Sequence, residues 1–297
     1  MVATYQSLKI RLQNQSYAWI RRASCVIIDE AHGATAPSYT EILGYLGIDK
    51  QDTERPLVGI TATPFRSSIN PEETQWLVNR FGRHRFDHDV LPGDDPYSVL
   101  QDRGILAKVD QIVIPGEELE LSAQELTDLK QFKTLPPSVE ARLGGNQERN
   151  ERIAASIAEL ESDWPVLLFA TSVEHANLMA AILCMKGLSA RAISGETDRG
   201  ARRHYIEEFR RGNIRVLSNF NVLSTGFDAP SLRALYIARP VYSPVLYQQM
   251  IGRGLRGPSN GGKDRCLVVN VNDNIAQFGE KLAFHHFEYL WSESNAS

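Results

Sequence analysis

The sequence predicts an α/β protein with two parallel-sheet lobes, the first of them incomplete. Two observations support this fold class. Short apolar, β-branched runs alternate with helical patterns near both ends of the chain, and polar residues follow the carboxyl ends of several runs. That edge of an open parallel sheet is where ligands bind. At 297 residues the chain is long enough for two domains of ordinary size. We place a partial first lobe at 1–86, a connector of helices and a hairpin at 87–150, a second lobe at 151–281, and a C-terminal helix or tail at 282–297.

The first lobe contains one strand, helix, strand unit. An apolar run at 24–28 ends in Asp-Glu-Ala-His, a helical pattern covers 39–46, and a second apolar run at 57–60 ends in Thr-Ala-Thr-Pro. This spacing is typical of a βαβ unit. Both polar clusters therefore fall at the same edge of the predicted sheet.

The second lobe shows a longer alternation. Thr171 or Ser172 can cap a helix that runs to Lys186, and Gly187 stands where a helix normally ends. We expect helices at 147–160 and 199–211 as well, and strands at 165–170, 189–193, 214–218, 234–238 and 266–271.

A third helix of this lobe is predicted after Ser243, which can cap it, with proline at the first helical position. On that helix Gln249, Arg253 and Arg256 are spaced i, i+4 and i+7, so we expect them to share one face. Two arginines on one stripe suit a polyanion whose charge grows during phosphoryl transfer. A solvated charged face is the alternative.

Composition excludes several classes of protein. The apolar fraction of 42% indicates a globular chain, and the formal charge of −4 means that any nucleic-acid binding must depend on local patches. The three cysteines are scattered, which predicts buried thiols in a reducing compartment and neither a disulfide framework nor a zinc site. No apolar run approaches the roughly 20 residues of a membrane span, and no leader follows Met1. We expect a cytoplasmic protein with no membrane partner.

Six blocks in a fixed order carry a family resemblance. The chain resembles superfamily 2 helicases of the DEAD/DEAH type, and within them the branch of type III restriction-enzyme motor subunits and RadD-like DNA-repair helicases. This resemblance implies two RecA-like lobes with a cleft between them. The matching blocks are ATYQSL at 3–8, DEAH at 29–32, TATPFR at 61–66, LFAT at 168–171, STGFDAP at 224–230 and QMIGRGLR at 249–256.

The resemblance implies ATP and Mg²⁺ as cofactors. Asp29 would hold the metal, Glu30 would orient and deprotonate the attacking water, and His32 would connect the nucleotide site to the neighbouring motif. Thr61 and Thr63 would relay the nucleotide state between the lobes. An acidic turn that binds nothing, and turn chemistry before Pro64, are the structural alternatives.

The second lobe would complete the site. The resemblance makes Arg253 and Arg256 arginine fingers and places Gln249 with them among the catalytic residues. Gly226 would let the backbone approach the nucleotide closely, and Asp228 would lie near the ribose or the residues that couple the two lobes.

The partner implied by the resemblance is DNA, with RNA as the alternative. Short hydroxyls and backbone amides suit phosphate contacts, which carry little base information. Arginines 199, 202 and 203 are either helper charges or a solvated face. The candidate nucleic-acid contacts are Thr4, Gln6, Thr171, Ser172, Gly195 and Thr225.

The sequence departs from the family in one place. No Gly-x-x-x-x-Gly-Lys-Ser/Thr occurs in it, and Gly261-Gly262-Lys263-Asp264 has the wrong spacing. We therefore expect the first strand and its P-loop to precede this chain, or to come from another chain, and we expect the chain alone to hydrolyse ATP negligibly. The alternatives are a nucleic-acid-binding module without ATPase activity and a purely structural α/β domain. Apolar residues at helical spacing in 284–291 predict a helix that packs on the second lobe, with a partner-binding helix as the alternative.

Overall fold

The computed structural model describes residues 1–48, 55–61, 71–84, 96–132, 135–223, 229 and 231–275. The chain divides into two compact units, Met1–Leu91 and Pro92–Ser297, and each is described by itself. Both are α/β in architecture, as the sequence predicts. Among the described residues, no helix combines the length and apolar character needed to cross a bilayer.

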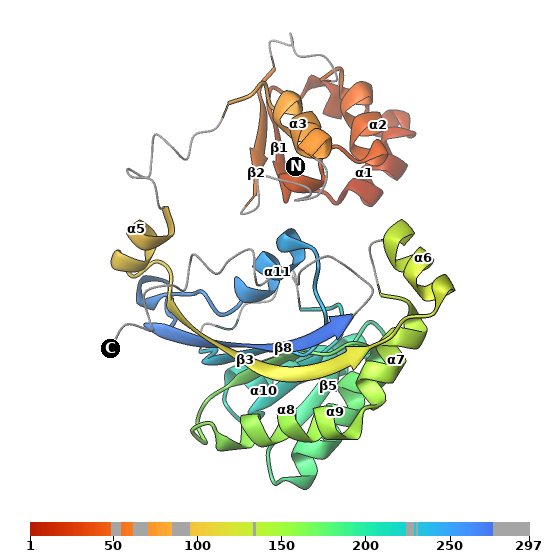
Figure 1. Ribbon diagram of the computed structural model, residues 1–297. Helices are drawn as coiled ribbons and strands as arrows, with labels where there is room; N and C mark the ends of the chain where they lie inside the picture. The colour runs from red at the N-terminus through yellow and green to blue at the C-terminus, as the bar shows by residue number, and fades with distance from the viewer. Residues whose placement is uncertain are drawn as a thin grey trace. The chain divides into compact units, whose positions relative to one another are not determined.

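The first unit is built around a two-stranded parallel sheet, with Asp29 of one strand opposite Ile60 of the other. Apolar side chains from the helices and from the first strand form one core, which includes Leu12, Ile28, Leu43 and Leu77. Figure 1 shows α1 and α2 beside this sheet. The elements are α1 (Tyr5–Leu12), η1 (Gln15–Arg22), β1 (Val26–Asp29), η2 (Ala31–Gly33), α2 (Pro37–Leu46), β2 (Leu57–Ile60) and α3 (Pro71–Arg80).

The two faces of this sheet differ in burial. Ile28 is buried in the core, whereas Ile27 is 63% exposed and Ile60 is 56% exposed. The β1–β2 register places Ile27 and Ile60 on the same face, because residues two apart on one strand share a face. Parallel sheets are normally covered on both faces. The described residues therefore leave one apolar face of the first unit open.

The second unit is a six-stranded parallel sheet in the order β3-β8-β7-β4-β6-β5. The elements are α5 (Pro96–Asp102), β3 (Lys108–Leu119), α6 (Ala123–Phe132), α7 (Pro137–Gly145), α8 (Gln147–Glu159), β4 (Val166–Phe169), α9 (Val173–Met185), β5 (Ala190–Ile193), α10 (Arg199–Arg210), β6 (Val216–Asn219), β7 (Ala234–Ile237), α11 (Pro244–Ile251), η3 (Pro258–Asn260) and β8 (Arg265–Ile275).

Helices cover both faces of the six-stranded sheet. One core joins Leu167, Leu217 and Leu235 of the strands to Phe209 of α10 and Met250 of α11. The opposite core joins alternate residues of the same strands to α8 and α9. Figure 1 shows α8 and α9 on one side of the sheet and α11 on the other. Strands buried on both faces explain the continuous apolar runs in this half of the sequence.

The structure corrects two of the sequence-based expectations and leaves two others as predictions. Residues 108–119, predicted within the connector, form β3, which pairs in parallel with β8 and makes no hairpin with it. Cys25 and Cys184 are exposed, so the expectation of three buried thiols holds only for Cys266. Apolar neighbours in the sequence do not by themselves bury a side chain, because successive residues of a strand or helix point in different directions. The predicted C-terminal helix lies outside the described residues, and the domain limits stay a prediction.

Candidate functional site

The polar residues of the first unit meet at the carboxyl ends of β1 and β2. Asp29 is the last residue of β1, and Thr61 directly follows Ile60 of β2. Because Asp29 and Ile60 are register partners, the two segments that continue from them start side by side. This is the edge of a parallel sheet where ligands bind.

Glu30 has a backbone conformation that is costly for its residue type. Its φ is 51° and its ψ is 48°, in the left-handed region that favours glycine. The Asp29 carboxylate accepts a hydrogen bond from the Glu30 backbone N–H at 2.9 Å, which supports the turn. The Glu30 side chain is about half exposed, at 47%. Such strain at an exposed acidic side chain is more common at functional sites than elsewhere.

His32 connects the two strand ends. Its Nδ1 lies 3.2 Å from the Thr61 hydroxyl and 3.4 Å from a Glu30 carboxylate oxygen. The turn after β1 and the residue after β2 are therefore joined through one imidazole. The sequence placed these residues in neighbouring motifs, and the structure brings them into contact.

The Asp29 carboxylate also affects the phenol of a nearby tyrosine, Tyr39. Burial raises the pKa of Tyr39, and the neighbouring Tyr5 and the Asp29 carboxylate raise it further. Tyr39 and Tyr5 also pack with ring centroids 5.5 Å apart. The Asp29 carboxylate therefore lies close enough to the Tyr39 phenol of α2 to disfavour its ionised form.

The candidate nucleic-acid residues of the first unit lie at the start of α1. Thr4 caps this helix, because its hydroxyl accepts a hydrogen bond from the Ser7 N–H at 3.2 Å. Gln6 is exposed in the first turn. Thr63, predicted to act with Thr61, lies outside the described residues.

In the second unit, Thr171 and Ser172 hold local structure. The Ser172 hydroxyl caps α9 by accepting from the His175 N–H. Thr171 is buried, and its hydroxyl donates to the Glu140 carbonyl at 3.1 Å. The Thr171 side chain is therefore used inside the protein, which the sequence did not predict.

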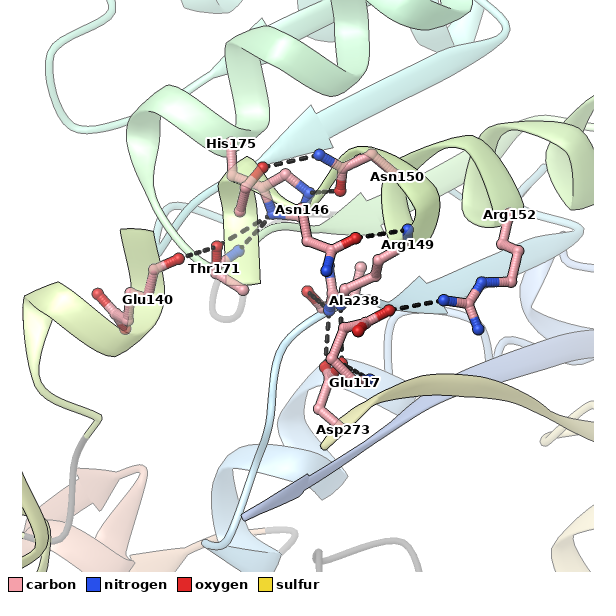
Figure 2. Close-up of polar contacts among 11 residues, drawn as sticks. Glu117, Glu140, Asn146, Arg149, Asn150, Arg152, Thr171, His175, Ala238 and Asp273 are labelled. Atoms are coloured by element: carbon pink, nitrogen blue, oxygen red, sulfur yellow. Dashed lines mark hydrogen bonds and ion pairs between the residues drawn. The ribbon is translucent and has the colours of Figure 1, made fainter. Parts of the chain in front are cut away.

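The buried His175 is neutral. The Thr171 N–H donates to Nδ1 at 3.1 Å, so the other nitrogen, Nε2, carries the proton and donates to the Asn150 amide oxygen at 3.0 Å. The Asn150 side chain in turn donates to the Gly144 carbonyl at 2.7 Å. Burial, with the charge of Arg149 adding to it, lowers the pKa of His175 to about 3. Figure 2 shows this chain of contacts across α7, α8 and α9.

A buried ion pair lies beside this network. Two guanidinium nitrogens of Arg149 donate to the two carboxylate oxygens of Asp273 at 2.7 Å, and both side chains are fully buried. Arg149 also donates to the Ala238 carbonyl, and Asp273 accepts from the Glu117 N–H (Figure 2). The pair therefore ties the start of α8 to the ends of β3, β7 and β8.

The prediction that Gln249, Arg253 and Arg256 share one helix is wrong. The helix α11 begins after Ser243, which caps it as expected, but it ends at Ile251. Gln249 lies on α11, Arg253 lies in the following turn, and Arg256 forms an isolated antiparallel bridge with Leu106. All three are half-buried.

A tightly packed glycine lies just past this early end of the helix. A Cβ at residue 254 would approach the Cys266 sulfur to 2.4 Å, so the chain packs there more closely than any other residue allows. The Arg253 Nε donates to the Gln249 carbonyl at 3.2 Å, which keeps that side chain against the last turn of α11. Helical spacing therefore does not describe how Arg253 and Arg256 lie.

Arg239 is a residue that the sequence analysis missed. It follows β7, donates to the Asn221 side chain at 2.7 Å, lies 3.5 Å from a Glu140 carboxylate oxygen, and packs on the Phe220 ring. It thereby joins α7, the segment after β6 and the segment that leads to α11. Only its position directly after an apolar strand distinguishes it in the sequence.

The remaining site residues have mixed outcomes. Gly195 is exposed in the loop after β5, and its carbonyl accepts from Arg202. Thr225, Gly226 and Asp228 lie outside the described residues. No group of three or more His, Cys, Asp or Glu side chains among the described residues forms a metal site.

Comparisons with known proteins agree with this geometry. Residues 148–257 match the helicase conserved C-terminal domain, and residues 1–66 match the res subunit of type III restriction enzymes. A Schizosaccharomyces pombe protein named as a mitochondrial ATP-dependent helicase, irc3, is 30% identical over 84% of this chain and 38% of its own length. A Saccharomyces cerevisiae protein named as the ATP-dependent helicase IRC3 is 27% identical over 91% of this chain and 36% of its own. The chain thus spans less than two fifths of either relative.

Solved structures show the same fold. A fragment assigned to the HsdR subunit of a Vibrio vulnificus type I restriction enzyme has a TM-score of 0.60 at 20% identity, covering 90% of this chain and 46% of that one. Dbp5 of S. cerevisiae, solved with RNA and ADP BeF3, has a TM-score of 0.56 at 14% identity, covering 98% and 62%.

Parallel sheets with polar strand ends, together with these matches, define a superfamily 2 helicase core with RecA-like units. Within that superfamily, the chain belongs to the restriction-enzyme-like branch.

Proposed function

We propose that this chain is part of an ATP-dependent motor that moves along nucleic acid, with DNA as its substrate. The observation that carries the proposal is the contact between His32 and Thr61 at the carboxyl ends of two parallel strands, beside Asp29 and Glu30. A turn that binds nothing has no need for this arrangement, since a half-exposed acid in a strained conformation costs stability.

The first unit offers groups that fit Mg²⁺ and an attacking water. One oxygen of Asp29 accepts from the Glu30 N–H, which leaves the other available to a hydrated cation. When bound, Mg²⁺ would neutralise charge on the phosphates. The half-exposed Glu30 carboxylate would orient the water and take its proton. His32 would report occupancy of this site to Thr61.

The second unit offers cationic and backbone groups. We propose that Arg253 and Arg256 stabilise charge that develops on the transferred phosphoryl group, with Gln249 beside them. Gly226 and Asp228 would contact the nucleotide, and Thr63 would act with Thr61. For nucleic acid, exposed Gly195 and the start of α1, with Thr4 and Gln6, are the supported contacts. Thr171, Ser172 and Thr225 remain proposed contacts, with Thr171 acting through its position next to α9.

A P-loop from outside these 297 residues is part of the proposal. The exposed face of Ile27 and Ile60 is consistent with a further strand and helix that cover the first unit, supplied by a longer form of the chain or by a partner. We therefore propose that this chain alone hydrolyses ATP negligibly. The alternative function, a nucleic-acid-binding module completed by a partner, shares the same surfaces.

Two measurements on the purified chain test the proposal. Fluorescence anisotropy with labelled duplex DNA and with RNA of equal length should show salt-dependent binding. A phosphate-release assay with ATP and Mg²⁺ should show no stimulation by either nucleic acid. Absence of nucleic-acid binding at low salt would contradict the function, and stimulated turnover would contradict the need for a P-loop.

A further inference from the structure

The outer face of helix α9 is apolar and exposed. Every residue from Leu178 to Met185 is apolar, and a helix that is apolar on all sides is normally buried. The inner face meets this expectation, since Met179 and Leu183 are fully buried against the sheet that α9 covers (Figure 1). On the outer face, however, Leu178 is 40% exposed and Met185 is 88% exposed. Packing among the described residues therefore leaves this face of α9 uncovered.

The exposed side chains form a stripe with a regular spacing. Glu174, Leu178 and Ala181 are spaced i, i+4 and i+7, and Met185 continues the series at i+11. Because neighbours at i+3 and i+4 lie on one face of a helix, the four side chains line up along α9. All four residues are exposed. Positions with this spacing face a second helix in a coiled coil, so the outer face of α9 has the pattern of one half of a helix pair.

The two ends of this stripe carry opposite charges. Glu174 lies in the first turn of α9 and is exposed, and Lys186 directly follows the last residue of the helix. The Lys186 Nζ lies 2.9 Å from a Glu151 carboxylate oxygen, but the two side chains are 33% and 49% exposed. Exposed pairs of this kind contribute little free energy, so another carboxylate can replace Glu151 at small cost.

A second copy of α9 that runs antiparallel fits this stripe. In the register that places Leu178 opposite Ala181 of the second copy, a large side chain faces a small one in both directions. The same register brings Glu174 beside Lys186 of the second copy, so opposite charges meet at both ends of the contact. A parallel pair would instead place the Glu174 carboxylates of the two copies side by side. The stripe is therefore complementary to itself in the antiparallel direction.

We propose that the outer face of α9 is a self-association surface, on which two copies of this chain pack their α9 helices antiparallel. Each copy contributes the same patch, as in other two-fold interfaces. A stripe of four side chains covers less than the roughly 800 Å² per partner that stable dimers bury, so the dimer should be weak and should depend on concentration. This inference goes beyond the proposed function, and either can fail without the other.

Sedimentation velocity of the complete chain, from micromolar to near-millimolar concentration, measures this association. The parent chain should shift reversibly from monomer to dimer as its concentration rises. Met185→Glu places an acid opposite Glu174 of the second copy and removes two buried methionine side chains from each dimer. It should therefore raise the dissociation constant by about tenfold or more. Since Met185 is exposed in the monomer, the substitution should leave the fold intact.

A charge exchange tests the antiparallel register. Glu174→Lys alone and Lys186→Glu alone each bring like charges together, so each should weaken the dimer several-fold at low salt. Glu174→Lys/Lys186→Glu restores opposite charges at both ends, and its dissociation constant should return toward that of the parent chain. A parallel dimer would show no such recovery, because like charges would still meet in the double variant.

The matched control places the same acid on another exposed apolar side chain of the second unit. Ile112 is 48% exposed and lies on β3, at the opposite edge of the sheet from β5, on which α9 packs. Ile112→Glu should leave the dissociation constant unchanged. Thermal unfolding of every variant checks that the fold persists.

Four results would overturn the inference. A parent chain that stays monomeric over the whole concentration range leaves the outer face of α9 to another part of a longer protein or to a different partner. Equal weakening by Ile112→Glu shows non-specific association. Association that persists in Met185→Glu but is abolished by Ile27→Glu assigns the contact to the open face of the first unit. A charge-exchange double variant that does not recover rules out the antiparallel register.

Discussion

The Nδ1 atom of His32 lies 3.2 Å from the hydroxyl of Thr61, although the two residues are 29 positions apart. The contact joins the turn after β1 to the residue after β2. Since Glu30 lies 3.4 Å from the same nitrogen, a proton on Nδ1 can be donated to either oxygen. Movement of the Glu30 carboxylate would therefore change the hydrogen bond between His32 and Thr61.

A double-mutant cycle measures this contact. Thr61→Val and His32→Phe should each destabilise the chain, and their effects should be non-additive by about 0.5–1.5 kcal/mol, the range for one net hydrogen bond. Urea unfolding followed by circular dichroism gives the free energies. Thr61→Ser keeps the hydroxyl and serves as the control. Strict additivity would show that the contact carries no coupling.

The strain at Glu30 predicts a separation of stability from function. Glycine adopts φ 51° without penalty, so Glu30→Gly should be about 1 kcal/mol more stable than Glu30→Ala. Both variants lack the carboxylate and should be equally unable to support hydrolysis in a form that contains a P-loop. Thermal unfolding of the two proteins side by side makes the comparison. An alanine variant as stable as the glycine variant would argue against backbone strain.

His175 predicts how stability depends on pH. Burial, and then the charge of Arg149, lowers its pKa to about 3 in the folded protein, below the ordinary value of 6.5. The unfolded chain therefore binds the proton more readily between these values. The stability contributed by neutral His175 is complete above pH 6.5 and is lost as pH falls toward 3, at up to about 1.4 kcal/mol per unit.

Urea unfolding between pH 7 and pH 4 tests this slope. His175→Asn removes the titrating group, so its stability should be lower at pH 7 but should fall less steeply with acid. Protonation of the Asp and Glu carboxylates contributes equally to the pH dependence of both proteins. A variant with the same slope as the parent would show that His175 does not set the acid sensitivity.

The pair between Arg149 and Asp273 should behave as a buried ion pair. Arg149→Met leaves the buried Asp273 carboxylate without its cation and should cost about 3–5 kcal/mol. Arg149→Met/Asp273→Leu removes both charges and should cost less than either single change. Free energies of unfolding from urea titrations check the order. A double variant less stable than both singles would show that the charges themselves stabilise the unit.

Much of the fold follows from periodicity. The strand predicted at 57–60 matches β2, and the second-unit helices predicted at 147–160 and 199–211 match α8 and α10 within one residue. These segments succeed because alternation of apolar runs with capped, amphipathic helices leaves few other solutions. The strand at 108–119 was missed. It forms by pairing with β8, where Lys108 is the partner of Arg265, and a local sequence pattern cannot indicate so distant a partner.

The candidate site was predictable in part. Asp29, Glu30 and Thr61 were placed by their position after apolar strands, and the structure brings them to one edge. The burial of Thr171 and the departure of Arg253 from the helix depend on close packing around Gly144 and Gly254. Arg239 depends on three segments that converge only in the folded chain. Such contacts are tertiary, so sequence spacing does not reveal them.

The most direct test of the central claim is the ATPase activity of a version extended at its N-terminus by an apolar strand, a Gly-x-x-x-x-Gly-Lys-Thr loop and a helix, assayed with and without DNA. We predict that this version shows DNA-stimulated turnover, whereas the 297-residue chain does not. Glu30→Gln should lower kcat by about 10²–10⁴, and Arg253→Ala should lower it by about 10³–10⁵. Turnover that survives both substitutions would contradict the account.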